Sequence, residues 1–150
     1  MITGLFETHI EVSNLEKAMS FYEEILGLQL GRKEEDRRIA FYWIGKPGQS
    51  MLGLWEKPLV HTRHFAFQCD AHWILHESVN FLQNKGLNPY NFLRNGSPDP
   101  MVFAWMPALA VYFNDPDGNV LEFISMLPGK PMPEKGVISY EEWQQAAQVG

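Results

Sequence analysis

The strongest constraint on the fold of this 150-residue chain is a succession of local signals that occurs twice. Each copy has an alternating segment that predicts a strand, a polar capping residue, a stretch with apolar residues three and four apart that predicts a helix, and a Gly-Leu pair that ends it. The strands are predicted at residues 8–12 and 63–68, and both carry a histidine. The repeat therefore predicts two similar modules, with His9 and His64 in equivalent places.

The sequence also predicts what lies between and after these strands. Ser13 or Asn14 can cap the first helix, which Gly27 ends, and the second helix is predicted at residues 71–85, before Gly86. Further strands are predicted at residues 29–32, 38–44 and 50–55 in the first half and at residues 91–94, 108–114 and 119–125 in the second. Each module is thus expected to have the order βαβββ.

Charge and cysteine content narrow the possible partners and the cellular compartment. Acidic residues outnumber basic ones by 18 to 12, so the clustered Lys and Arg of a nucleic-acid-binding surface are not expected. Cys69 is the only cysteine, which excludes an intrachain disulfide and fits a reducing cytoplasm. The N-terminal segment lacks the features of a signal peptide, and no stretch approaches the ~18 apolar residues of a membrane span. We therefore expect a cytoplasmic protein without membrane or nucleic-acid partners.

Three segments carry a resemblance to a known family: FETHIEVSNLEKAMSFYEEILGL, TRHFAFQC and VYFNDPDGNVLEF. They resemble the vicinal oxygen chelate superfamily, which holds glyoxalase I, extradiol dioxygenases, and the fosfomycin- and bleomycin-resistance proteins. The last segment is the most specific, because a Tyr-Phe strand, an Asp-Pro-Asp-Gly turn and a Glu in the following strand are typical of the family. The resemblance implies an α+β fold in which paired βαβββ modules form a cupped mixed sheet, with a metal in the cup and often a homodimer.

The resemblance covers about residues 4–126, and the chain length fits a single domain. We expect a domain at residues 1–126, with modules at about residues 4–57 and 60–126, followed by a tail at residues 127–150. The tail begins with sequence rich in Pro, Gly and Lys, and residues 139–142 are a capping-box signature that predicts a short helix through Gln148. The tail can cover the cavity, swap to a partner subunit or hang free.

Three residues are candidate metal ligands: His9, His64 and Glu122. Strand alternation allows all three to face one cavity. A carboxylate among the apolar residues around Glu122 costs several kcal/mol unless a cation neutralises it. Two imidazoles and one carboxylate leave positions open on a divalent ion such as Fe, Mn, Zn or Ni. The alternative is that the histidines are hydrogen-bonded core residues and that Glu122 pairs with Arg63 or Arg94.

Glyoxalase I is expected to use a fourth ligand, a Glu in the last strand of the first half. Matching MLGLWE to VLEFIS puts Gly53 at the position of this Glu, and Glu56 has the opposite strand parity. The missing carboxylate argues against true glyoxalase I activity.

Other side chains of the sequence are candidates for a chemical role. Tyr112 resembles the tyrosine near the metal in extradiol dioxygenases and fosfomycin-resistance enzymes, and Glu11 can act as a base on the face of the first histidine. His61 is expected to point away from the metal. His72 and His76 fit an exposed helix face better than a metal site. Candidates for an aromatic cup wall are Phe41, Trp43, Trp55, Phe103 and Trp105.

These residues favour a divalent-metal-dependent lyase or dioxygenase, whose small substrate chelates the metal through neighbouring oxygens. A metal-free, bleomycin-resistance-like binding protein is the first alternative, and the three candidate ligands count against it. A fosfomycin-resistance-type transferase or hydrolase is the second, and the absence of an Arg shortly after Glu122 weakens it.

Overall fold

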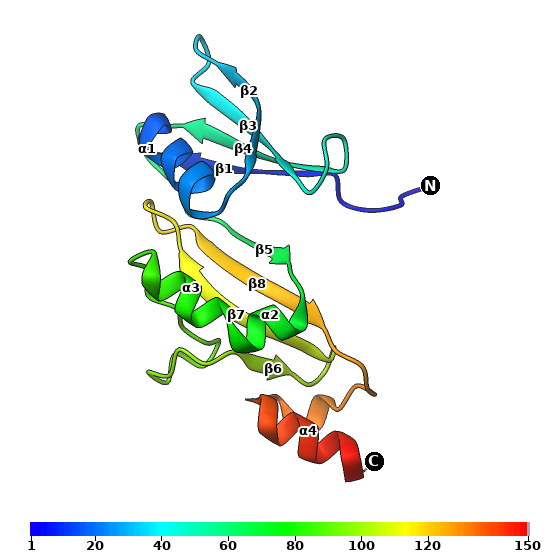
Figure 1. Cartoon of the computed structure of the whole chain (residues 1–150). Coiled ribbons are helices and arrows are strands. Elements are labelled where there is room, and N and C mark those ends of the chain that lie inside the picture. Colours follow the sequence, from blue (N-terminus) through cyan, green and yellow to red (C-terminus); the bar gives the residue numbers. More distant parts are fainter. Residues whose placement is uncertain (150) are drawn as a thin grey trace. The chain divides into compact units, whose positions relative to one another are not determined.

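The computed structural model describes residues 1–149, which divide into two compact units (Figure 1). Unit 1 comprises residues 1–63 and the turn at residues 115–119. Unit 2 comprises residues 64–114 and the residues from 120 onward. Each unit contains one mixed sheet with its own helices, so each can be described by itself.

The sheet of unit 1 has the strand order β1-β4-β3-β2, in which β1 and β4 are parallel and the other pairs are antiparallel. Asn14 caps its helix by accepting a hydrogen bond from the Lys17 N–H at 2.9 Å, and Gly27 ends the helical stretch with φ 71°. Leu15 and Ala18 bury the helix against the sheet. In chain order the elements are β1 (Glu7–Val12), α1 (Leu15–Ser20), the π-helical η1 (Phe21–Ile25), β2 (Gln29–Glu34), β3 (Ile39–Ile44) and β4 (Ser50–Glu56).

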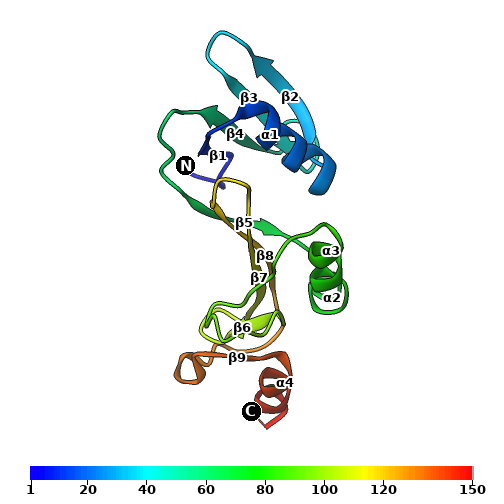
Figure 2. The same cartoon turned by 90° about the vertical axis from the view of Figure 1, so that its left-hand side faces the viewer.

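The sheet of unit 2 repeats this plan, with the order β5-β8-β7-β6-β9. The parallel pair β5 and β8 corresponds to β1 and β4, and β9 is an addition beside β6 (Figure 2). In chain order the elements are β5 (His64–Gln68), α2 (Ala71–His76), α3 (Ser78–Asn84), β6 (Met101–Phe103), β7 (Ala108–Asn114), β8 (Val120–Met126), η2 (Pro133–Lys135), β9 (Val137–Ser139) and α4 (Tyr140–Val149).

Two elements of unit 2 differ from the sequence prediction. The helix predicted at residues 71–85 is interrupted at Glu77, whose φ is −126°, and the Ser78 hydroxyl donates back to the Ile74 carbonyl. The strand predicted at residues 91–94 is a loop, because Asn91 holds the chain in turns and Arg94 has φ 50°. The strand beside β7 is formed instead by residues 101–103.

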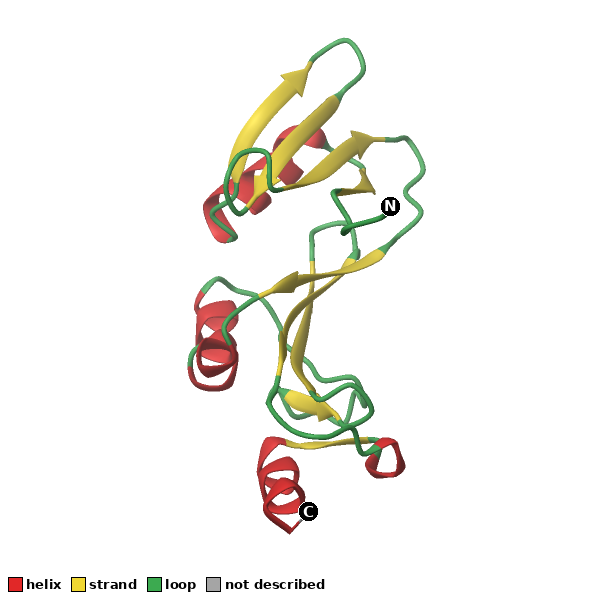
Figure 3. Cartoon of the chain, turned by 90° about the vertical axis from the view of Figure 1, so that its right-hand side faces the viewer, coloured by secondary structure: helices red, strands yellow, loops and turns green. Residues whose placement is uncertain are grey.

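The C-terminal segment is part of unit 2. Its strand β9 pairs with β6, and the helix α4 follows it at the C-terminal end (Figure 3). Trp143 in this helix is buried. The capping box forms as predicted, since Ser139 Oγ accepts from the Glu142 N–H at 3.1 Å and Glu142 Oε1 accepts from the Ser139 N–H at 3.3 Å.

The predicted fold class, an α+β chain of two βαβββ modules with a C-terminal helix, is confirmed. Among residues 1–149, every helix is too short or too polar to cross a membrane.

Candidate metal and substrate site

Two predicted metal ligands lie together in unit 2. His64 begins β5, Glu122 lies in the middle of β8, and His64 Nε2 is 3.1 Å from Glu122 Oε1. His64 Nδ1 is 2.9 Å from the Val120 carbonyl oxygen, which can only accept a hydrogen bond. Nδ1 therefore carries a proton, and the neutral ring turns its Nε2 lone pair toward the carboxylate. Two acceptors so close require a proton or a cation between them.

Burial strengthens this requirement. Glu122 is only 4% exposed, and its removal from water raises the pKa of the carboxyl group, while His64 partly offsets the rise. Tyr112 lies directly opposite Glu122 on β7. Burial and the nearby Glu122 raise the pKa of the Tyr112 phenol above its ordinary value, so this hydroxyl keeps its proton at neutral pH. The alternative that Arg94 neutralises Glu122 is wrong, since the carboxylate pairs with His64.

A pocket of about 250 Å³ opens beside this pair. The loop after α3 forms one side of it with Tyr90, Phe92 and Arg94. The sequence named Arg94 only as a possible partner of Glu122. It did not identify Tyr90 or Phe92, because it predicted a strand at residues 91–94 instead of a loop. The full lining is His64, Tyr90, Asn91, Phe92, Arg94, Tyr112 and Val120.

The third predicted ligand, His9, lies in unit 1. Trp55 Nε1 donates to His9 Nδ1 at 2.7 Å, and His9 Nε2 is 3.3 Å from Glu7 Oε2. An indole N–H only donates, so in the neutral ring Nδ1 holds the lone pair and Nε2 carries the proton. A Cβ atom at Gly53 would collide with this ring, so glycine makes the ring position possible. To bind a metal as a neutral ligand, His9 must give up the hydrogen bond from Trp55, because either the metal takes Nδ1 or the ring proton moves there.

The strand register identifies the counterpart of Glu122 in unit 1. β1 begins at Glu7, opposite Met51 on β4, and β5 begins at His64, opposite Val120 on β8. Gly53 lies two residues beyond Met51, as Glu122 lies two residues beyond Val120, and both are buried in the middle of their strands. Matched from their first residues, the two parallel pairs put Gly53 at the position of Glu122, so this position lacks a carboxylate. In the same match Glu7, not His9, takes the place of His64.

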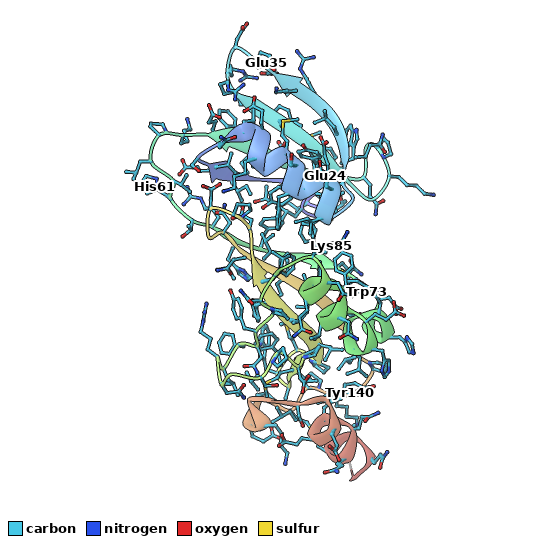
Figure 4. The ribbon with its side chains drawn as sticks, turned by 60° about the vertical axis from the view of Figure 1, so that its left-hand side comes forward. Glu24, Glu35, His61, Trp73, Lys85 and Tyr140 are labelled. Atoms are coloured by element: carbon cyan, nitrogen blue, oxygen red, sulfur yellow. The ribbon has the colours of Figure 1, made fainter. Side chains whose placement is uncertain are left out.

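Glu11, the predicted base, is engaged by His61. Glu11 Oε1 accepts from the His61 N–H at 2.8 Å and is 3.0 Å from His61 Nδ1. The hydrogen bond from the backbone N–H is the largest cause that lowers the pKa of Glu11. Glu11 also lines a unit 1 pocket of about 240 Å³ with His9, and its role as a base stays a prediction. Figure 4 shows His61 on the loop that leads to β5.

The remaining candidates are distributed between the two units. His72 and His76 are exposed on α2, with ring centroids 4.4 Å apart. Of the aromatic candidates, Phe41 and Trp55 contact the His9 ring edge-on in unit 1, whereas Phe103 packs in the core of unit 2. Within either unit, residues 1–149 hold no group of three or more His, Cys, Asp or Glu side chains placed together as metal ligands. The structure thus brings two of the three predicted ligands together within one unit.

Comparison with known proteins assigns the chain to a family. A family model described as Glyoxalase/Bleomycin resistance protein/Dioxygenase superfamily matches residues 4–123. An integron cassette protein from the mobile metagenome of the Halifax Harbour sewage outfall is 33% identical, with a TM-score of 0.70, and the match covers 83% of this chain and all of that one. The curated proteins contain no match.

Two more distant structures share the fold. Lactoylglutathione lyase from Agrobacterium tumefaciens is 21% identical, with a TM-score of 0.64, over 83% of this chain and 94% of that one. A fosfomycin resistance protein from Listeria monocytogenes is 18% identical, with a TM-score of 0.64, over 85% of this chain and 96% of that one. Together with the repeated βαβββ topology, the family match establishes that this chain belongs to the Glyoxalase/Bleomycin resistance protein/Dioxygenase superfamily.

Proposed function

We propose that the protein is a divalent-metal-dependent enzyme, a lyase or a dioxygenase, that acts on a small substrate with two neighbouring oxygens. His9, His64 and Glu122 would hold the metal. Divalent metals are common in this superfamily. The proposal depends mainly on one observation, the 3.1 Å approach of His64 Nε2 to Glu122 Oε1.

The chemistry of this pair suits a cation. The Val120 carbonyl fixes the proton of His64 on Nδ1, which orients the ring and leaves Nε2 free to act as a ligand. The proton shared by His64 and Glu122 can be exchanged for a divalent ion, so metal binding should release protons. Glu122 is too buried for water to solvate its charge, and a bound metal would offset the free-energy cost of burying that charge.

The other residues have roles that do not depend on the identity of the metal. When bound, the ion would supply Lewis-acid stabilisation of negative charge on the substrate oxygens. Tyr112, which keeps its proton, would donate a hydrogen bond to one of these oxygens. The aromatic pocket beside it would exclude water and orient the substrate. Glu11 would accept a substrate proton after its hydrogen bonds with His61 are released.

Elemental analysis tests the metal proposal. Protein that has been stripped with chelator, reloaded with Zn²⁺ or Mn²⁺ and desalted should carry one equivalent per chain. Glu122→Ala should carry less than a tenth of this, whereas Glu77→Ala, which removes an exposed carboxylate of the same unit, should load normally. Circular dichroism would verify that each variant is folded. Unchanged loading of folded Glu122→Ala would contradict the proposal.

The alternative functions are separable by experiment. Binding of a flat aromatic ligand to stripped protein, undiminished by chelator, together with no metal loading, would indicate a metal-free binding protein instead. Oxygen uptake in the presence of a catechol would distinguish a dioxygenase from a lyase. We further propose that the enzyme acts in the cytoplasm as a homodimer, without nucleic-acid or membrane partners. Sedimentation of the purified chain tests the dimer.

A further inference from the structure

The wall of the unit 2 pocket carries one permanent cation and no acid. Among its lining residues, Arg94 is the only Lys or Arg, and none is Asp or Glu. In unit 2 as a whole, acidic residues outnumber Lys and Arg. We propose that Arg94 binds the carboxylate of a small organic acid, whose apolar body packs on Phe92 and Tyr112. If the proposed function holds, this acid is the substrate, or the part of the substrate that leaves in the reaction.

Arg94 lies over an aromatic ring, and its guanidinium makes no hydrogen bond with any residue from 1 to 149. The backbone N–H of Arg94 donates to the Asn91 carbonyl at 3.0 Å, and the backbone of Arg94 has the left-handed conformation. Its guanidinium carbon is 4.4 Å from the centroid of the Tyr90 ring. Among residues 1–149, no carboxylate forms a salt bridge with it. The delocalised guanidinium is planar, so its N–H donors lie in one plane and two of them can form parallel hydrogen bonds to a carboxylate.

The ring that supports Arg94 is fixed relative to the metal-ligand pair. Tyr90 stacks on Tyr112 with centroids 5.8 Å apart and planes 18° from parallel. The backbones of these two residues exchange hydrogen bonds of 2.9 Å in both directions, and the Tyr90 hydroxyl donates to Asn114 Oδ1 at 2.6 Å. The Tyr112 ring lies 5.8 Å from the His64 ring. Arg94, Tyr112 and His64 are therefore parts of one continuous wall.

The apolar part of the wall and its size restrict the ligand further. Phe92 lines the pocket and is 57% exposed, although its ring contacts Phe103 and Tyr112, so part of an apolar side chain is open to a ligand. A volume of about 250 Å³ is small for a ligand pocket. These features fit a small aromatic or branched acid better than a long chain or a polyanion.

Paired probes of equal shape test the proposal. Benzoate and benzamide differ in charge but hardly in size, and their binding to chelator-stripped protein can be measured by calorimetry. The wild type should bind benzoate about tenfold more tightly than benzamide. Arg94→Gln should lose this preference without losing benzamide binding, and Arg94→Lys should keep part of it. Lys85→Gln is the matched control, because Lys85 also lies over an aromatic ring, Phe81, at the end of α3 (Figure 4).

Equal binding of the two probes by the wild type, or an undiminished preference in Arg94→Gln, would overturn the proposal. The measurement is made without metal, so it does not depend on metal loading. Arg94→Gln should load metal like the wild type. A wild type that prefers benzoate but loads no metal would refute the proposed function and leave the anion site standing.

Discussion

Replacing Glu122 by Gln separates the effect of the buried charge from that of the side-chain shape. Burial raises the pKa of Glu122 in the folded protein above its value in the unfolded chain. The folded state is therefore not destabilised by Glu122 below the unfolded pKa, where the side chain is protonated. Stability is lost as the pH rises through the folded pKa and the buried carboxyl group becomes charged. Gln has nearly the same shape and no charge. Without metal, we expect Glu122→Gln to match the wild type near pH 4 and to be about 1 kcal/mol more stable at pH 8.

Metal should reverse this order. At a metal concentration 100 times Kd, binding stabilises the folded state by about 2.7 kcal/mol. A change of 1 kcal/mol shifts Tm by about 2–4 °C in a chain of this size, so the wild type should gain about 5–11 °C. Glu122→Gln, which lacks the carboxylate ligand, should gain less than about 2 °C, since a metal held by fewer ligands binds far more weakly.

Differential scanning calorimetry at pH 8, with chelator and then with excess metal, measures both effects. Glu77→Gln removes an exposed carboxylate of the same unit and should behave as the wild type in both conditions. The reasoning fails if Glu122→Gln gains the full metal shift. It also fails if this variant is less stable than the wild type in chelator.

Three further substitutions test neighbouring parts of the account. Trp55→Phe removes the donor to His9 Nδ1, so calorimetry should give about three- to tenfold tighter metal binding, and unchanged or weaker binding would contradict the tautomer assigned to His9. The Tyr112 hydroxyl hydrogen-bonds Glu122 and lowers the pKa of its carboxyl group, so Tyr112→Phe should raise this pKa. Protons then compete better with the metal, and metal affinity should fall more steeply than in the wild type between pH 7 and pH 6. Parallel pH profiles would refute this coupling. Ser139→Ala removes the cap of α4 and should lower the free energy of unfolding by about 1 kcal/mol in urea, whereas Ser125→Ala, whose hydroxyl makes only a 3.4 Å contact, should cost less.

The sequence predicted the elements whose determinants are local. The cap at Asn14, the helix stop at Gly27 and the capping box at Ser139 each depend on a few neighbouring residues, and all three form. The repeat then predicted the βαβββ plan, because two segments with the same local signals have the same pairing options.

The remaining features depend on contacts between distant residues. Alternation predicts which face of a strand a side chain takes, but not its partner on the next strand, so the hydrogen bond from Trp55 to His9 was not predicted. The backbone of Arg94 is left-handed because of a loop that closes only in the folded chain. Local sequence does not show this conformation, so the sequence predicted a strand at this residue. The proximity of Glu122 and His64 was predicted, because both are candidate ligands of one metal. The proton position on His64 was not, because it depends on the Val120 carbonyl.

Anomalous diffraction at the metal absorption edge, from crystals of the reloaded full-length protein, tests the central claim most directly. The account predicts one strong peak per chain, in contact with His64 Nε2, a carboxylate oxygen of Glu122 and a nitrogen of a His9 ring. A structure at full metal loading with no peak between His64 and Glu122, or with a peak there that no His9 contacts, would contradict the proposed three-residue site.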